Sequence, residues 1–234
     1  MDLDHGKTGH AIETDLDAQE SPRGGGPIQI PLEAFIPEQL DGFLVAEKNI
    51  SQSRLVNGAT RLQPVTILTG QAVGVMAALA TKAGVQPRLL DAKQVQSALL
   101  DAGSTLIQRW HSDVPWHTPL WKATQLLSLY QVLDRPGPIT KDEQPLAAGN
   151  PWGVAKPLTP DELHTALARL RELSGRRGSL PKLSDGPSVS AQELTEALAA
   201  MDSAWPSAVQ RGEIADAERI TAGEFALIAP AGEM

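Results

Sequence analysis

The sequence predicts an α-rich chain in two parts: a partial α/β segment over residues 1–108 and a small all-α repeat tail over residues 109–234. Three observations predict this organisation. In the first part, a short apolar run leads into a long helix of small residues. In the second part, one type of helix start recurs at a fixed spacing. Stretches rich in Pro and Gly, at 134–160 and 174–188, act there as connectors.

The α/β character of the first part depends on residues 41–84. The apolar run Gly42–Ala46 predicts a short strand that is covered on both faces. A polar loop follows. Pro64 then marks the start of a helix, because the first turn of a helix does not need the N–H that proline lacks. Gly84 is placed to end that helix.

Small residues line one face of this helix. A glycine inside a helix costs about 0.5–1 kcal/mol relative to alanine, so two glycines four residues apart predict that another backbone or a flat ligand approaches closely. The N-terminus of the helix also favours an electron-rich group, because its N–H groups are unpaired. The small residues on the face are Gly70, Gly74, Ala77, Ala78 and Thr81.

A second helix is predicted directly after this one. It should run from Asp91, a good N-cap, to Ala102, with Gly103 as the residue that ends it.

Three segments of the first part, IPLEAFIP, FLVAEKNIS and NGATRLQPVTILTGQAVGVMAAL, resemble the C-terminal signature of FAD-dependent oxidoreductases. The resemblance covers about residues 1–100. It implies that this part closes the isoalloxazine site of FAD, with the N-terminus of the Pro64 helix at the pyrimidine end of the ring. The residues that it implies for cofactor binding are Asn49, Ser51, Arg61, Pro64, Gly70, Gln71 and Gly74.

Each of these polar residues also has an ordinary alternative role. Arg61 suits a substrate or the flavin edge, because guanidinium groups bind planar anions, but it could instead pair with a carboxylate such as Glu47. Asn49, Ser51 and Gln71 could make the common hydrogen bonds of loops and helix starts.

Flavoproteins of this kind begin with a strand, a G-x-G-x-x-G turn and a helix that together hold the pyrophosphate. No strand is predicted before Gly24–Gly26 and no helix after it, so this segment is predicted to be a loop. We therefore expect the C-terminal portion of an FAD-dependent oxidoreductase, inactive alone, whose partner is a separate N-terminal dinucleotide-binding domain. The catalytic residues and the substrate are not identified by the sequence.

The second part contains an internal repeat of helix starts. Thr159, Ser190 and Thr221 lie 31 residues apart, each preceded by an aliphatic residue and followed three positions later by Glu. This is the pattern of a capping box with a hydrophobic staple residue. Three copies in fixed register predict a helical repeat module.

This part also resembles S-layer homology repeats. The order of an Asp-Val and Trp segment at 111–116, a helix around 120–133 and the helix start at 158–162 is similar to theirs. The Arg that follows the hydroxyl residue in those repeats is replaced by Pro160, Ala191 and Ala222. The resemblance implies a non-catalytic module for the cell envelope or for polysaccharide, as the alternative to a compact helical tail.

The five tryptophans fit either reading of the second part, as a sugar-binding surface or as anchors of a small helical core. They all follow residue 109: Trp110, Trp116, Trp121, Trp152 and Trp205. A third possibility for the whole chain is a decayed gene product with neither activity.

Composition excludes several classes. With a net charge of −8 and no basic patch, nucleic acid is not an expected partner. The absence of cysteine removes disulfides and thiolate chemistry, and the histidines lack metal-site spacing. The uncharged run at 65–81 is short for a membrane span and contains Gln71, so a buried helix is expected there. No signal peptide pattern is present, and the compartment is not identified; the envelope is one option.

Overall fold

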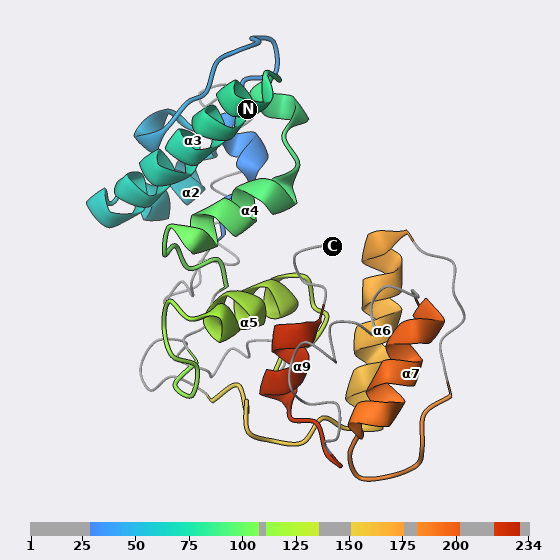
Figure 1. Ribbon diagram of the computed structural model, residues 1–234. Helices are drawn as coiled ribbons and strands as arrows, with labels where there is room; N and C mark the ends of the chain where they lie inside the picture. Colours follow the sequence, from blue (N-terminus) through green and yellow to red (C-terminus); the bar gives the residue numbers. More distant parts are fainter. Residues whose placement is uncertain (1–28, 108–110, 136–150, 176–181, 202–217, 230–234) are drawn as a thin grey trace. The chain divides into compact units, whose positions relative to one another are not determined.

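Figure 1 shows the computed structural model, which describes residues 29–107, 111–135, 151–175, 182–201 and 218–229. The chain forms two compact units, Met1–Thr105 and Leu106–Met234. Both units are helix-rich, and the described residues contain no strand; their one β-bridge pairs Pro157 with Thr221.

The first unit is built around two α-helices. The long helix α3 packs against α4, and the 3-10 helices η2 and η3 also contact α3. Its core side chains include Phe35, Ile50, Met76, Val95 and Leu99. The elements in chain order are η1 (Leu32–Phe35), η2 (Glu47–Asn49), α2 (Arg54–Thr60), α3 (Gln63–Ala83), η3 (Pro87–Leu89) and α4 (Ala92–Asp101).

The predicted boundaries of α3 and α4 are confirmed. Pro64 lies in the first turn of α3, and Gly84 ends that helix in a left-handed conformation with φ of 66°. The Asp91 carboxylate caps α4 by accepting the N–H of Lys93 at 3.0 Å. Gly103, with φ of 81°, follows the last turn of α4, so it is the predicted residue beyond the cap.

The predicted strand at Gly42–Ala46 is wrong in the described part of the chain. This segment is irregular, and Val45 N donates a single backbone hydrogen bond to Phe35 O at 2.9 Å. A strand needs a partner strand for its N–H and C=O groups, and no strand is described here. The α/β character is therefore not visible, and the predicted polar loop contains a further helix, α2, which is capped by Ser53.

One arginine fastens residues 37–41, directly before the irregular segment, to the rest of the first unit. The Arg88 guanidinium donates to the backbone oxygens of Pro37, Glu38 and Leu40 at 2.9–3.1 Å. It also pairs with the Asp41 carboxylate at 3.0 Å. Arg88 thus holds the backbone directly before the irregular segment in place.

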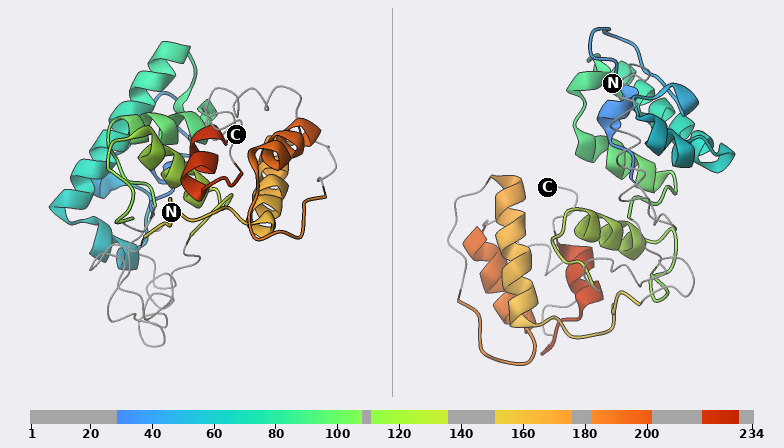
Figure 2. Two further views of the ribbon diagram at one scale, coloured as in Figure 1. Left: turned by 60° about the horizontal axis from the view of Figure 1, so that its bottom comes forward. Right: turned by 180° about the vertical axis from the view of Figure 1, so that it is seen from behind.

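The second unit contains four described α-helices, α5 (Pro119–Leu129), α6 (Pro160–Ser174), α7 (Ala191–Met201) and α9 (Ala222–Ile228). Helix α5 packs on α9, and α6 lies beside α7 (Figures 1 and 2). Helix α5 ends at Leu129, four residues before the predicted helix end at Leu133. Gln131, two residues after the end of α5, has a left-handed φ of 56°.

The three repeated helix starts meet in a closed ring of backbone hydrogen bonds. Leu158 N donates to Ile220 O, Ile220 N to Val189 O, and Val189 N to Leu158 O, at 2.7–2.9 Å. These aliphatic residues, which precede the three capping boxes, are at most 1% exposed. Each following N-cap, Thr159, Ser190 or Thr221, accepts the N–H of its Glu three positions later. The ring therefore brings together three segments that are distant in sequence.

A carboxylate in the segment before α5 binds the backbone that leads toward the ring. The Asp113 oxygens accept the N–H groups of Trp152, Gly153 and Val154 at 2.6, 2.7 and 3.0 Å. Burial acts to raise the pKa of Asp113, but these three donors outweigh it and hold the pKa below its ordinary value of 3.8. Val154 O in turn accepts from Gly223 N at 2.9 Å at the start of α9.

Arg135 completes this network. Its guanidinium pairs with Glu162, the carboxylate of the first capping box, and donates to Gly153 O and Pro157 O at 3.2 Å. Burial acts to raise the pKa of Glu162, but the hydrogen bonds from Arg135 and Thr159 outweigh it and lower that pKa. In the second copy, the hydrogen bond from Ser184 lowers the pKa of Glu193.

Candidate functional site

The small-residue face of α3 points away from the core of the first unit. Thr69, Met76 and Ala80 are the buried residues of this helix. Gly74 and Ala78 are exposed, and at 100° per residue they lie on the opposite side of the helix. The outer face of α3, defined here as Ile67, Gly70, Gly74, Ala78 and Thr81, is therefore the face predicted to receive a close neighbour.

No described part of the chain supplies that close neighbour. A Cβ atom built at Gly70 or at Gly74 would meet no heavy atom within 4 Å. The sequence thus contains two helix-weakening glycines that no contact within the described residues explains.

Several large apolar side chains of the first unit are exposed. Two of them lie on α3, where Ile67 is 71% and Leu68 56% exposed. Further exposed residues of the same unit are Leu40, Phe43, Val56, Leu62, Val85 and Leu89.

By length and composition alone, α3 could cross a membrane, and only 17% of its apolar window is buried in the structure. Core helices of soluble proteins pass the same test, so this finding is weak evidence by itself.

The predicted cofactor residues lie on three neighbouring elements. Asn49 ends η2, and Ser51 follows it, with Ser51 N donating to Ala34 O at 2.8 Å. Arg61 is the C-cap of α2, directly before the first turn of α3, where Pro64 lies. All four residues are exposed. No ion pair between Arg61 and Glu47 is present in the described part of the chain.

Gln71 is used differently from the prediction. It lies about 12 Å along the helix axis from the start of α3, at 1.5 Å per residue. Its side-chain oxygen accepts the Ser104 hydroxyl at 2.9 Å, and its side-chain nitrogen donates to Ala102 O at 3.4 Å. Gln71 therefore connects α3 to the residues after α4 and is not grouped with Arg61 and Pro64.

Sequence reasoning missed a polar cluster beside α2. Thr60, which is 1% exposed, donates its hydroxyl to the Gln52 side-chain oxygen, and Gln52 donates to Asn57 Oδ1 at 3.2 Å. The cluster fixes the chain after Ser51 against α2. Ser53, a good N-cap, was the signal that could have revealed α2.

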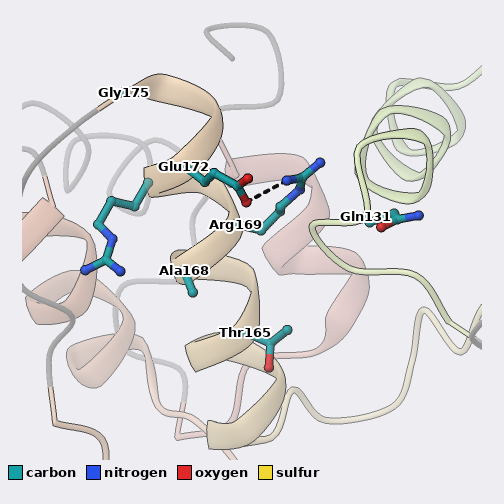
Figure 3. Close-up of a pocket in the computed structure, with 7 residues that line it drawn as sticks. Gln131, Thr165, Ala168, Arg169, Glu172 and Gly175 are labelled. Atoms are coloured by element: carbon teal, nitrogen blue, oxygen red, sulfur yellow. Dashed lines mark hydrogen bonds and ion pairs between the residues drawn. The ribbon is translucent and has the colours of Figure 1, made fainter.

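A shallow groove of about 650 Å³ lies in the second unit, between the turn after α5 and the C-terminal half of α6 (Figure 3). Arg169 in this groove donates to Tyr130 O at 2.9 Å and pairs with Glu172 at 2.6 Å. The Arg169 guanidinium therefore already donates to two groups of the chain itself. The groove also presents the Thr165 hydroxyl and the Gln131 amide.

Three rings stack at the start of α5. The His117 ring centroid lies 4.5 Å from that of Trp116 and 5.6 Å from that of Trp121. His117 has a left-handed φ of 60°, which is uncommon for a residue other than glycine. Trp121 is buried, whereas Trp116 is 51% exposed, so the stack runs from the core to the surface.

The described residues contain no group of three His, Asp or Glu side chains that could hold a metal ion.

Comparison with known proteins bears on the first part of the chain. Residues 2–99 match the family model described as FAD dependent oxidoreductase, which covers less than half of the chain. No curated protein and no solved structure matches the chain. This match supports the expected resemblance of about residues 1–100: residues 2–99 are similar to FAD-dependent oxidoreductases.

Proposed function

We propose that the first unit is the C-terminal portion of an FAD-dependent oxidoreductase that closes the isoalloxazine site and has no activity alone. The family match over residues 2–99 carries this proposal. Bound flavin would supply the hydride or electron chemistry, while the protein contributes orientation and electrostatics. Arg61, Pro64, Asn49 and Ser51 would face the ring. All four are exposed, and Arg61 and Pro64 lie at the start of α3.

The outer face of α3 supports a partner for this unit. Space beyond Gly70 and Gly74 fits a flat ring or a close backbone, because no side-chain or backbone atom of the described residues fills it. The partner that we propose is a polypeptide carrying the dinucleotide-binding part of an FAD-dependent oxidoreductase. It would cover the exposed Ile67 and Leu68 and hold the pyrophosphate of FAD, for which residues 29–105, the described part of the first unit, offer no glycine-rich turn.

The test compares flavin retention by the chain alone with retention after co-expression with the N-terminal portion of an FAD-dependent oxidoreductase. We expect little flavin absorbance in the purified chain alone and a retained visible flavin band in the co-purified pair. Gly74→Leu should leave the chain folded, since its Cβ position is open, but should prevent retention by the pair. A colourless pair, or an equally yellow Gly74→Leu pair, would reject the proposal.

A second candidate function, polysaccharide binding by the second unit, is favoured by the exposed ring stack. Trp116 is 51% exposed, its ring lies beside that of His117, and the His117 ring in turn lies beside the buried Trp121. Aromatic side chains offer apolar area with a polar edge, which suits the faces of sugar rings. Co-sedimentation of the chain with purified cell-wall polysaccharide tests this function. Binding should be lost in Trp116→Ala, and sedimentation of that variant at the wild-type level would argue against it.

A further inference from the structure

The sequence contains three asparagines, and they differ in the residue that follows. Asn57 precedes Gly58, whereas Asn49 precedes a buried isoleucine and Asn150 precedes a proline. The side-chain amide of an asparagine can be attacked by the backbone nitrogen of the next residue. Glycine leaves this nitrogen unhindered and the backbone free to turn, a β-branched residue restricts it, and proline has no N–H to lose. The sequence therefore singles out Asn57 as a reactive side chain.

Asn57 and Gly58 lie in α2, a helix of seven residues with little packing to hold it closed. Of the α2 residues whose side chains the structure describes, Thr60 alone is buried, whereas Asn57 is half-buried and Gly58 is exposed. A Cβ atom built at Gly58 would meet no heavy atom within 4 Å. A short helix with an internal glycine is marginal without packing, so α2 opens at a low free-energy cost.

The polar cluster beside α2 opposes this opening. The buried Thr60 hydroxyl donates to the side-chain oxygen of Gln52, and the Gln52 amide donates to Asn57 Oδ1 at 3.2 Å. Side chains of a helix point back toward its N-terminus, so the Asn57 amide in closed α2 is directed away from Gly58 N. The hydrogen bond from Gln52 holds the amide in that position.

We propose that Asn57–Gly58 is a site of spontaneous modification, gated by the opening of α2, with Gln52 as the positioning residue that keeps the helix closed. In the open state, Gly58 N attacks Asn57 Cγ, the proton on Gly58 N passes to water, and the side-chain nitrogen leaves as ammonia. Water then opens the resulting succinimide and gives aspartate or isoaspartate at position 57. One water is consumed and one ammonia is released, so no oxidant or reductant is required.

The experiment incubates the full chain at neutral pH and follows each asparagine by mass spectrometry of its peptides, which separates the acid from the amide. We expect Asn57 to convert several-fold faster than Asn49, the control within the same sample. Gly58→Ala should slow the conversion about fivefold, because alanine strengthens the helix and hinders the nitrogen. Gln52→Leu should accelerate it about fivefold, the effect of losing one net hydrogen bond that closes α2. Gln94→Leu, at an exposed site on α4, is the matched control and should leave the rate unchanged.

Urea provides a measurement on the parent chain without any substitution, which keeps the test valid if Gln52→Leu does not fold. Unfolding removes the gate, so the rate at Asn57 should rise with the unfolded fraction. Conversion of Asn57 no faster than that of Asn49, or a rate that does not respond to urea, would overturn the proposal. A folded Gln52→Leu chain that converts at the parent rate would overturn the role given to Gln52.

The conversion also bears on Arg61, and this step rests on the proposed function. A carboxylate at position 57 would lie one helical turn before Arg61, whose backbone N–H already donates to Asn57 O at 3.1 Å. Opposite charges four residues apart on a helix attract each other, so Asn57→Asp should draw the guanidinium away from the flavin ring and weaken flavin retention by the co-purified pair about twofold. A colourless parent pair counts against the proposed function, whereas equal retention by a yellow parent pair and its Asn57→Asp variant counts against the coupling to Arg61.

Discussion

Replacing Asp113 by Asn should destabilise the second unit more than any neighbouring surface change. The carboxylate accepts three successive backbone N–H groups at 2.6–3.0 Å. Asn keeps one accepting oxygen and turns an N–H₂ donor toward the remaining N–H groups, so one or two bonds are lost. A hydrogen bond to a charged group contributes about 1.5–3 kcal/mol, and the free energy of unfolding should fall by about 2–4 kcal/mol.

Tryptophan fluorescence during urea unfolding measures this loss selectively. All five tryptophans belong to the unit Leu106–Met234, so the signal reports on the second unit alone. With a slope of about 1–3 kcal/mol per molar urea, the midpoint should fall by roughly 1–3 M. Ser112→Ala, at an exposed neighbouring site, is the control. A change in Asp113→Asn below about 0.5 kcal/mol, the usual effect of surface substitutions, would refute the role assigned to this carboxylate.

The same variant tests the pH dependence. Because the pKa of Asp113 is lower in the folded chain than its ordinary 3.8, the ionised group stabilises the fold above the unfolded pKa. That contribution is lost as the pH falls from about this value toward the folded pKa. Asp113→Asn should therefore lose less stability than the parent chain between neutral pH and pH ~3, and parallel pH profiles of the two proteins would contradict this.

Four further substitutions test separate contacts. Gly223→Ala should destabilise the second unit by about 1–3 kcal/mol, because its Cβ would lie 3.0 Å from Val154 O. Gly74→Ala, whose Cβ meets nothing, should instead stabilise the isolated chain by about 0.5–1 kcal/mol in a calorimetric melt. Arg135→Met leaves Glu162 without its guanidinium and should lower stability by about 2–3 kcal/mol in the fluorescence assay. Arg88→Ala should accelerate amide exchange within residues 37–42 several-fold, and unchanged exchange there would contradict its clamping role.

Local sequence signals predicted the helix ends of this chain well. Features that depend on contacts between distant segments were not predicted. Pro64, Gly84, Asp91 and Gly103 mark helix boundaries through the backbone conformation or the single hydrogen bond that each one supplies. A strand is different, because it exists only where another segment pairs with it. The run at 42–46 has the composition of a strand but has no partner among the described residues, so composition alone gave the wrong element.

The same contrast between local signals and distant contacts holds for the candidate site. Residue types predicted that another backbone or a flat ligand approaches Gly70 and Gly74. No described residue does so, and this stays a prediction. Sequence could not predict that Gln71 turns from this site to Ser104, since that hydrogen bond depends on how the end of α4 lies against α3. Likewise, spacing revealed the three capping boxes, but not the ring in which Leu158, Val189 and Ile220 bond to one another.

The ring also explains why the repeats differ from S-layer repeats at one position. The residue that follows the N-cap is Ala191 in the second copy and Ala222 in the third, and both are at most 1% exposed. An arginine at either place would put a charged group at a buried position, which is strongly unfavourable unless it is paired. Of the described tryptophans, Trp116 is exposed whereas Trp121 and Trp152 are buried, so Trp116→Ala is the variant that tests saccharide binding by this unit.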